Sequence, residues 1–432
     1  MYALSEPLTG LTPLEVMFRR IIQFILKQKS KRILRRFNPL VVGVTGSVGK
    51  SSTKEAVALA LSSCFNVRKS PINYNNEIGL PLTILDEKSG EGSLLQWLKL
   101  FWRTERKFRQ LKEYPDILVL EMAADHPGDI DYLLSIVQPK IGVLTAIGPC
   151  HLKYFKNIEN VKREKIKLLT NVNKNGWAIF NQDDPNLSDI KSRLKANVLT
   201  YGFGSSADIF PLEIQLSQEL RGKQVHIFGL YFKVRCLGSI IPVFLPKILS
   251  RSVISAVLAA IAVGVSQKIN LLKISEKMRQ YKPLPGRMNL IKGSRKTLII
   301  DDSYNSSPRS VKSALFDLSQ IKNHPQTKKW VVLGDMLELG RDEKKYHLEI
   351  GKEIGRRKSC VLIGIGKLAR FIVKGAIDVG MSKNRALYFK EKKDALRHLR
   401  ENIGEGDVVL IKGSRAMKME ELVKGLKSSL SF

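Results

Sequence analysis

The hydrophobic pattern between residues 41 and 201 alternates short, continuous apolar runs with longer amphipathic stretches. Four runs have the length and β-branched content of strands that are buried on both faces: LVVGVT, DILVLEM, KIGVLTAI and GWAIFN. The stretches between them have helical spacing, as in the crossover helices that join parallel strands. The pattern therefore predicts an open, doubly wound, mostly parallel α/β sheet.

Two later regions depart from this rhythm. Residues 205–248 include the alternating stretch KQVHIFGLYFKVRCL, which predicts antiparallel strands, and SVISAVLAAIAVGV then restores a helix. Residues 282–291 (KPLPGRMNLI) have the proline and glycine density of a linker. After them, TLIIDDS, KWVVLGDM, CVLIGIG and DVVLIKGS predict a second sheet. We therefore expect an N-terminal segment (1–38), a central α/β domain (39–285) and a Rossmann-like α/β C-terminal domain (286–432).

Two segments combine helical spacing with many basic residues. Residues 14–37 (LEVMFRRIIQFILKQKSKRILRRF) predict a basic amphipathic helix, and residues 88–114 predict a basic helical insertion that carries Trp97, Phe101, Trp102 and Phe108. A basic amphipathic helix lies well on an anionic bilayer surface. The alternative is a helix that packs on the protein body with its basic face in water. The first reading predicts a peripheral membrane contact through residues 14–37.

The charge balance is strongly basic, with 72 Lys and Arg against 40 Asp and Glu and a net charge of +32. Such a charge fits nucleic acid, an anionic membrane face, acidic ligands or a lysine-rich solvated surface. The four cysteines are far apart without CxxC spacing, as expected for reduced thiols in a cytoplasmic protein. No apolar run has transmembrane length, and no signal-peptide cleavage pattern follows the N-terminus.

A glycine-rich stretch, GVTGSVGKSS, follows the first predicted strand and precedes a predicted helix. The strict Walker pattern is missed by one position, because Val44 stands where its first glycine belongs. Backbone N–H groups of such a loop, with the helix N-terminus, still favour a bound phosphate. The loop therefore predicts a nucleotide site, with Lys50 on the phosphates and the Ser51 hydroxyl on Mg²⁺. The expected phosphate-loop residues are Gly46, Ser47, Gly49, Lys50, Ser51 and Ser52.

Glu121 ends the predicted strand DILVLE, at the edge where an open parallel sheet binds its ligands. A metal-bound nucleotide requires a carboxylate near the phosphates. Glu121 is accordingly predicted to bind the metal, the alternative being a strand-end ion pair with a lysine.

Eight strings resemble the Mur ligase family and occur in the family's order. They are GVTGSVGKSS, NNEIGLPLTIL, EMAADHPGDI, HLKYF, LPGRMNLI, DDSYNSSP, VLGDMLELG and IKGSRAMKME. The resemblance covers about nine-tenths of the chain, from residue 40 to the C-terminus. It implies ATP-dependent amide bond formation through an acyl phosphate, with ATP and Mg²⁺ bound. The strings NNEIGLP, DDSYN and GDMLELG favour the branch that joins D-alanyl-D-alanine to UDP-N-acetylmuramoyl-tripeptide in peptidoglycan synthesis.

The resemblance also assigns roles to individual residues. Lys50, Glu121, His151 and Lys165 form the implied catalytic set; His151 matches a metal-ligating histidine, and Lys165 matches a carbamylated lysine that helps to bind the second Mg²⁺. A carbamate converts a cation into an anionic oxygen ligand for Mg²⁺. The remaining implied contacts are Arg287 near the phosphates, Asp302 on the ATP ribose, and Asn75, Asn76, Ser414 and Arg415 on the substrates.

The match departs from the family at two places. The family's N-terminal UDP-binding domain precedes the phosphate loop, and only about forty residues do so here, so that domain is expected to be missing. The family's His-Asn pair and later Asn near the adenine correspond to Ser252, Val253 and Ala256. Polar contacts to the base are therefore expected to be absent, whereas contacts to the phosphates are retained.

Three other functions compete with this interpretation. One is a ligase of the same superfamily that acts on folate or another precursor. Another is a nucleic-acid-binding P-loop ATPase, which the charge favours but the dispersed basic residues oppose, so no nucleic acid partner is expected. The last is a scaffold that only binds ATP, against which Lys50, Glu121, His151 and Lys165 are all present.

Overall fold

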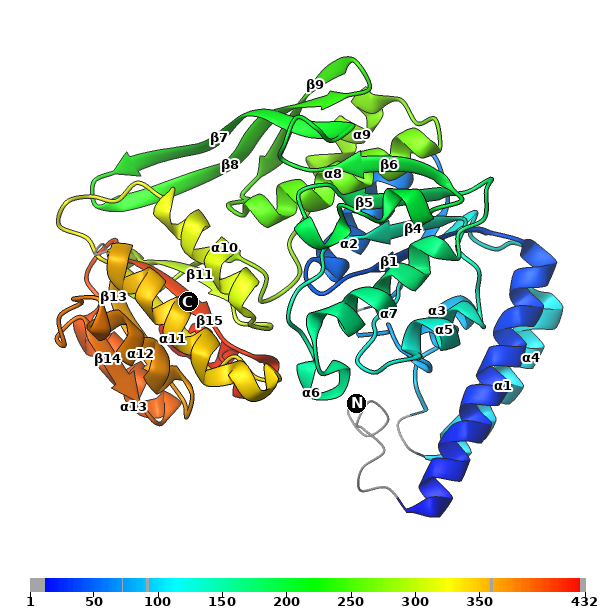
Figure 1. Cartoon of the computed structure of the whole chain (residues 1–432), viewed down its shortest axis with the longest axis horizontal. Coiled ribbons are helices and arrows are strands. Elements are labelled where there is room, and N and C mark those ends of the chain that lie inside the picture. The colour runs from blue at the N-terminus through cyan, green and yellow to red at the C-terminus, as the bar shows by residue number, and fades with distance from the viewer. Residues whose placement is uncertain (1–11, 72, 91–92, 358–359, 428–432) are drawn as a thin grey trace, which may run out of the picture.

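The computed structural model describes residues 12–71, 73–90, 93–357 and 360–427. Two sheets organise the molecule, with the larger sheet A in its upper right and the smaller sheet B in its lower left (Figure 1). The prediction of a doubly wound, mostly parallel sheet followed by a second α/β sheet is confirmed.

Sheet A has the strand order β2-β3-β1-β4-β5-β6-β7-β8-β9. Its first six strands are parallel, and β7, β8 and β9 continue it as an antiparallel ribbon. The bounds are β1 Leu40–Thr45, β2 Val67–Lys69, β3 Ile117–Glu121, β4 Ile141–Leu144, β5 Trp177–Asn181, β6 Asn197–Tyr201, β7 Ile209–Arg221, β8 Gln224–Cys236 and β9 Ser239–Pro246.

Helices cover both faces of the parallel part of sheet A, as continuous apolar strands require. Val42 and Val44 of β1 pack beneath one layer, and Val41 packs beneath the other. The first layer is α2 Lys50–Leu61, α8 Arg251–Ser266 and α9 Leu271–Met278. The second layer is α3 Gly79–Leu85, α5 Asp129–Leu134 and α7 Ile158–Thr170, followed outward by α1 Pro13–Phe37 and α4 Leu94–Gln110. A short helix, α6 Leu152–Phe155, lies between β4 and α7 in the chain.

Sheet B has the order β10-β11-β15-β12-β13-β14, and only its edge strand β10 is antiparallel to its neighbour. The strands are β10 Asn289–Lys292, β11 Leu298–Asp302, β12 Lys329–Gly334, β13 Val361–Ile365, β14 Ala386–Phe389 and β15 Val408–Lys412. Helices α10 Pro308–Ser319, α11 Glu343–Arg357 and α12 Ala369–Asp378 cover one face, and α13 Lys392–Asn402 and α14 Glu420–Leu426 cover the other.

The predicted linker over residues 282–291 is wrong at its C-terminal end. Asn289 already begins strand β10, which pairs with β11 through Asn289–Asp301 and the three following residue pairs. The sheet edge accepts this strand because an apolar Leu290-Ile291 pair follows the last turn of the proline-rich stretch. The irregular connection is therefore confined to the residues between α9 and β10.

The β7–β8 hairpin extends from sheet A across to the region of sheet B (Figure 1). The Gln218 side-chain amide donates to the carbonyl of Gln320 (2.8 Å) and accepts the N–H of Lys322 (2.9 Å). Val225 of the hairpin is buried in the apolar cluster that also contains residues of α10, α11 and α12. The hairpin thus joins the two halves of the molecule on one side.

Candidate active site

A cavity of about 300 Å³ lies where the carboxyl ends of strands in sheet A face residues from sheet B. Such ends of parallel strands are where open α/β sheets bind their ligands. Ten of the residues predicted for the site line it: Ser47, Gly49, Lys50, Ser51, Asn75, Glu121, His151, Arg287, Ser414 and Arg415. Five others do not appear in its lining: Gly46, Ser52, Asn76, Lys165 and Asp302.

The phosphate loop connects β1 to α2, which begins at Lys50. Gly46 and Gly49 both have positive φ, 144° and 88°, which side chains disfavour. A Cβ on Gly46 would also lie 2.0 Å from the hydroxyl of Thr145, so this glycine is required for close packing as well as for conformation. The Lys50 ammonium donates to the Gly46 carbonyl (2.8 Å) and folds back over the loop.

Glu121 lies at the carboxyl end of β3, beside the start of α2. One carboxylate oxygen accepts from the Ser51 hydroxyl (3.2 Å) and the Asn75 amide (3.1 Å). The other lies 3.8 Å from the ammonium of Lys54, a wholly buried side chain that also donates to the Ser70 carbonyl (2.7 Å). The structure therefore brings a hydroxyl, an amide and a carboxylate together beside the phosphate loop.

His151 begins α6 with a left-handed backbone (φ 50°) and lies between two carboxylates. Its Nε2 is 3.2 Å from Asp125, and its Nδ1 is 2.8 Å from Glu338. The hydrogen bond from His151 holds the pKa of Glu338 below its ordinary value. Glu338 follows β12, so this contact joins the region of sheet A to that of sheet B at the rim of the cavity.

Lys165 lies on α7 and is almost completely buried. Its ammonium donates to the Ala124 carbonyl (3.2 Å). Burial lowers the pKa of Lys165 to about 8, and the positive charge of Lys50 acts in the same direction. The neutral form, which is the form that reacts as a nucleophile, is therefore more populated near neutral pH than in an ordinary lysine.

The residues predicted for the substrates and the ribose lie in different settings. The side-chain oxygen of Asn76 accepts hydrogen bonds from the N–H groups of Ile78 and Gly79 (3.2 and 2.8 Å). These bonds form the turn that precedes α3. Asp302 is buried 2.6 Å from the ammonium of Lys412. The ring of Tyr304 lies 4.3 Å from the guanidinium of Arg287 and 5.8 Å from that of Arg415. The hydroxyl of Ser414 accepts the N–H of Leu337 (2.9 Å).

The predicted adenine positions are apolar or locally bonded. Val253 and Ala256 are buried in α8, and Ser252 bonds to the helix cap Ser250 (2.7 Å). The neighbouring Arg251 guanidinium lies between two aromatic rings, 4.5 Å from Phe203 and 5.0 Å from Phe316.

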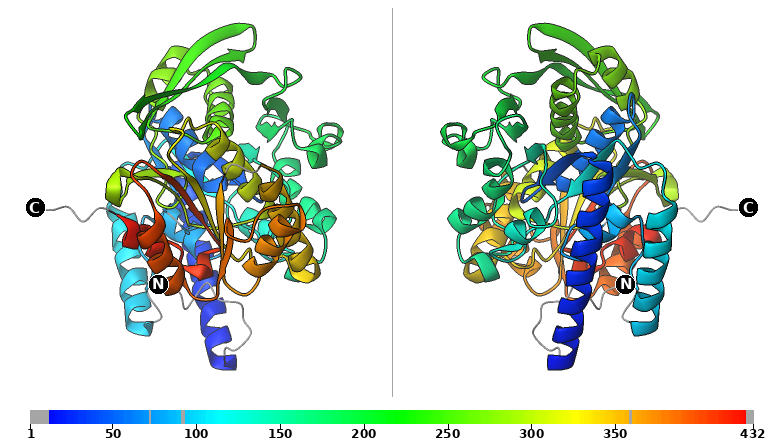
Figure 2. Two further views of the ribbon diagram at one scale, coloured as in Figure 1. Left: turned by 90° about the vertical axis from the view of Figure 1, so that its left-hand side faces the viewer. Right: turned by 90° about the vertical axis from the view of Figure 1, so that its right-hand side faces the viewer.

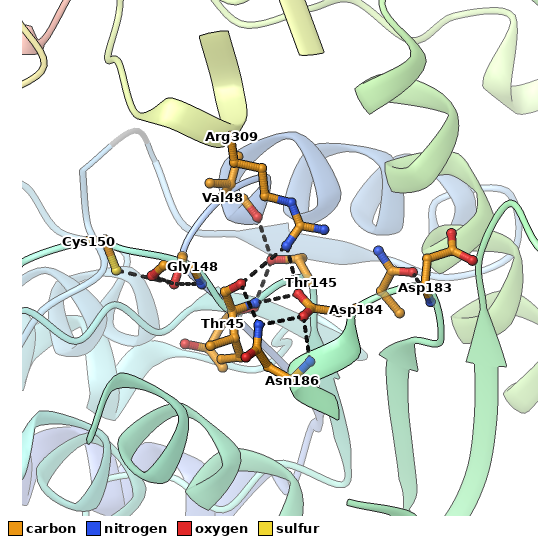
Figure 3. Close-up of polar contacts among 12 residues, drawn as sticks. Thr45, Val48, Thr145, Gly148, Cys150, Asp183, Asp184, Asn186 and Arg309 are labelled. Atoms are coloured by element: carbon orange, nitrogen blue, oxygen red, sulfur yellow. Dashed lines mark hydrogen bonds and ion pairs between the residues drawn. The ribbon is translucent and has the colours of Figure 1, made fainter. Parts of the chain in front are cut away.

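A second polar network lies behind the phosphate loop (Figure 3). The buried carboxylate of Asp184 accepts the N–H of Ile147 (2.8 Å) and pairs with the guanidinium of Arg309 (2.8 Å) from α10. The residue after Ile147, Gly148, donates its N–H to the hydroxyl of Ser47 in the phosphate loop (3.1 Å). Arg309 is thus connected to the loop through Asp184 and the segment that follows β4.

Sequence reasoning did not assign several of these residues. Asp125 and Glu338 lie within EMAADHPGDI and VLGDMLELG, two of the strings that resemble the Mur ligase family. The sequence therefore did contain a signal for these two residues. Lys54 lies one turn into the helix after the loop, but the sequence does not indicate that it is buried. Asp184 and Arg309 belong to distant parts of the chain, and their pairing has no local signature.

A phosphate loop at a sheet edge, opposed by charged residues from a second α/β sheet, defines a P-loop nucleotide-binding enzyme with a composite site. The Mur ligase middle domain matches residues 44–95 and 102–264, and the domain described as "Mur ligase, glutamate ligase domain" matches residues 286–415. The chain belongs to the Mur ligase family.

Curated relatives and solved structures agree with this assignment. The UDP-N-acetylmuramoyl-tripeptide–D-alanyl-D-alanine ligase of Bacillus subtilis is 33% identical over 94% of this chain and 79% of its own length. The enzyme of the same name from Escherichia coli is 28% identical over 90% and 77%. The crystal structure of MurF ligase from Thermotoga maritima with ADP has a TM-score of 0.75 at 27% identity and covers 93% of this chain and 83% of that chain. A MurF structure from Acinetobacter baumannii has a TM-score of 0.77 at 25% identity, with 93% and 80% covered.

Proposed function

We propose that this protein is an ATP-dependent ligase that adds D-alanyl-D-alanine to UDP-N-acetylmuramoyl-tripeptide in peptidoglycan precursor synthesis. One observation carries the proposal: the phosphate loop, Glu121, Arg287 and Arg415 line a single cavity. The names of the two relatives and the ADP complex of the Thermotoga maritima enzyme support the substrates and the nucleotide.

The reaction has two steps that this cavity suits. The carboxylate of the tripeptide attacks the γ-phosphorus of ATP, and ADP leaves, so that an acyl phosphate forms. The amine of D-alanyl-D-alanine then attacks the acyl carbon, phosphate leaves and the amine loses a proton. Both steps gather negative charge on transferring oxygens, which Lys50, Arg287 and the loop N–H groups are placed to stabilise.

The donor set beside the phosphate loop fits Mg²⁺. Among the described residues no group of three His, Cys, Asp or Glu side chains forms a metal cage. Mg²⁺ is commonly held by one or two carboxylates together with phosphate oxygens and water, so Glu121 with the Ser51 hydroxyl is a sufficient protein contribution. Bound there, Mg²⁺ would neutralise charge on the phosphates. Lys165, once carbamylated, would provide a further oxygen ligand. His151 would join this set only after its contact with Glu338 opens.

Residues 39–285 and residues 286–432 each contribute different side chains to the cavity. The first contributes the phosphate loop and Glu121, and the second contributes Arg287, Ser414 and Arg415. We assign Asp302 to the ATP ribose, with its carboxylate oriented by Lys412. We assign Asn75, Asn76 and the Ser414–Arg415 pair to the substrates, the arginine to the dipeptide carboxylate.

We also propose a peripheral contact with an anionic membrane surface through residues 14–37. None of the helices in the described part of the chain is long and apolar enough to cross a membrane. Helix α1 carries eight basic residues and one acidic residue, which favours contact with anionic lipid.

The ligase function is tested by phosphate release with ATP, UDP-N-acetylmuramoyl-tripeptide and D-alanyl-D-alanine, omitting one component at a time. We expect phosphate and amide product only when all three are present, and loss of both with Lys50→Ala. Phosphate release that needs neither acceptor, or nucleotide binding that survives Lys50→Ala unchanged, would contradict the proposal. Replacing the tripeptide by a folate substrate separates it from the folate ligases of the same superfamily.

A further inference from the structure

The solvent-facing side of helix α1 changes character along its length. Its first half exposes large apolar side chains at helical spacing, namely Leu14 (70% exposed), Met17, Ile21 and Phe24. The same side continues in the second half with the exposed Arg32, Arg35 and Arg36. The opposite side packs on the protein through Ile22, Leu26 and Ile33. The helix therefore packs on the body of the protein, as one of the two interpretations expects, and it also presents an apolar surface to solvent.

Helix α4 has the same gradient along its exposed side. Its first half exposes Leu94, Leu95, Leu98 and Trp102, of which Trp102 is 67% exposed. Its second half exposes Arg103, Arg106 and Arg109. Trp97 and Leu100, on the other side, are buried in the apolar cluster that also contains Ile22 and Leu26 of α1.

The two helices run parallel, so that their apolar halves lie at the same end of the pair. Glu105 pairs with both Lys29 (3.0 Å) and Arg32 (2.9 Å), and Arg36 donates to the carbonyls of Phe108 (2.7 Å) and Leu111 (2.9 Å). Residue numbers rise in the same direction on both sides of these contacts. Figures 1 and 2 show α1 and α4 side by side, with their N-terminal ends projecting below the rest of the molecule.

We call the projecting end the apolar tip (Leu14, Met17, Ile21, Phe24, Leu94, Leu95, Leu98 and Trp102) and the basic residues behind it the collar (Arg32, Arg35, Arg36, Arg103, Arg106 and Arg109). Single exposed apolar residues are normal on a protein surface, but a group of this size marks an interaction site. Together the two helices carry thirteen basic residues and only two acidic ones.

We propose that the apolar tip inserts into the interfacial region of an anionic bilayer while the collar binds the lipid headgroups. The tip bears leucine, phenylalanine and an exposed tryptophan, which suits the boundary between acyl chains and headgroups. The collar follows the tip along both helices, and each arginine that binds a headgroup would contribute about fivefold to binding. Arg35 and Arg106 are the exposed candidates, whereas Arg32, Arg36 and Arg103 also bond to Glu105, to backbone carbonyls and to Glu87. The bilayer is thus contacted end-on by two helices, instead of by α1 lying flat.

This inference deepens the proposed membrane contact and rests on it, but it is independent of the ligase reaction. The full-length protein is sedimented with vesicles of phosphatidylcholine and with vesicles that also contain phosphatidylglycerol. We expect binding to the anionic vesicles only, weakened about tenfold or more by Leu98→Ser/Trp102→Ser and by Leu14→Ser/Phe24→Ser. The matched control is Leu272→Ser, which removes a leucine of similar exposure (57%) on the remote helix α9 and should bind as wild type does.

Insertion is measured separately through Trp102, since Trp97 and Trp330 are buried and the partly buried Trp177 lies in β5 of sheet A. Lipids brominated on their acyl chains should quench the fluorescence of the wild type on vesicles, and Trp102→Phe should lose most of this quenching while still binding. Solution ligase activity of the tip variants should stay at the wild-type level. Three outcomes would overturn the inference: no binding of the wild type to anionic vesicles, equal binding of tip variants and wild type, or a concentration-dependent dimer that the tip substitutions abolish.

Discussion

At the scale of single residues, several charged side chains of the candidate site are buried. Lys54, Glu121 and Lys165 are all nearly inaccessible to water, and each is held by specific polar partners. Burying a charge without such partners costs several kcal/mol, so these contacts also maintain the shape of the site. The ammonium of Lys165 donates to the Ala124 carbonyl, and burial lowers the pKa of this side chain.

We expect Lys165→Ala to reduce ligase activity about a thousandfold, because stabilisation of a transferring phosphoryl group by its metal ligands is worth several kcal/mol. Folding should be retained, since alanine suits the helix. Added short-chain carboxylates should restore part of the activity by supplying the missing oxygen ligand. Steady-state kinetics with and without acetate measure both effects, and full activity of the variant in bicarbonate-free buffer would contradict the assignment.

Asp317 gives a prediction about stability against pH. Burial raises the pKa of Asp317 from an ordinary value of 3.8 to about 7, although its carboxylate accepts the N–H of Arg251 (3.1 Å). Between these two values the unfolded chain has released this proton and the folded chain keeps it. The contribution of Asp317 to stability therefore falls as the pH rises from about 4 to about 7.

Asp317→Asn removes this titration and should raise the melting temperature relative to the wild type at pH 8, with the difference shrinking towards pH 5. The free-energy difference is expected to be a few kcal/mol at most, at about 1.4 kcal/mol per pH unit. Thermal unfolding of both proteins across this range measures it. Parallel pH curves for the two proteins would show that Asp317 titrates normally.

The local sequence reveals only part of this chemistry. Lys50, Ser51 and Glu121 were predictable because each follows a strand end or a glycine loop, where the ligand edge of a sheet lies. The amino-acid sequence does not indicate which lysines are buried, so Lys54 was not predicted as a site residue. Asp184 and Arg309 were missed because a contact between residues 125 positions apart depends on how the sheets are placed.

At the scale of elements, periodicity predicted the long buried strands and the long helices, including α1, α4 and α8. It missed the three-residue β2, the five-residue β6 and the strands β10 and β14, because short, partly exposed strands do not produce a sustained apolar run. The β1–α2 connection was predicted from its glycines. The structure adds that the two glycines serve different purposes: Gly46 contacts Thr145, whereas a Cβ on Gly49 would meet only ordinary van der Waals neighbours.

The two glycines should consequently differ in their response to alanine. Gly46→Ala places a Cβ against the Thr145 hydroxyl and should weaken nucleotide binding by about a hundredfold or more, because the loop must move. Gly49→Ala carries only the strain of a positive φ, worth roughly 1–2 kcal/mol, and should weaken binding by about tenfold. Titration with a fluorescent ATP analogue compares them. Equal losses in the two variants would show that packing against Thr145 does not matter.

At the scale of the whole molecule, two regions far apart in sequence form one cavity and are joined at several points. Arg309 pairs with Asp184, His151 pairs with Glu338, and the β7–β8 hairpin packs on the region of sheet B. Hydrophobic periodicity does not reveal contacts between distant parts of the chain, so the composite cavity was expected only from the family resemblance. The polar chain from Arg309 to Ser47 connects the C-terminal part of the chain to the phosphate loop. It offers a physical route by which closure, meaning the approach of residues 286–432 to the phosphate loop, and the loop itself would influence each other.

We expect Arg309→Gln to lower kcat/KM for ATP about tenfold, because the buried Asp184 loses its charged partner and the closed arrangement is less favoured. Small-angle scattering with nucleotide bound should give a larger radius of gyration than for the wild type. Lys312→Gln is the matched control, since it removes one charge from the same helix but pairs with Glu353 within the same half. Identical behaviour of the two variants would rule out a role of Arg309 in closure.

The β7–β8 hairpin has a consequence for dividing the chain into separate domains. Because Gln218 bonds to Gln320 and Lys322 and Val225 is buried among α10, α11 and α12, a segment of sheet A completes the apolar cluster of the C-terminal part of the chain. Residues 286–432 on their own would leave this part of the cluster exposed to water.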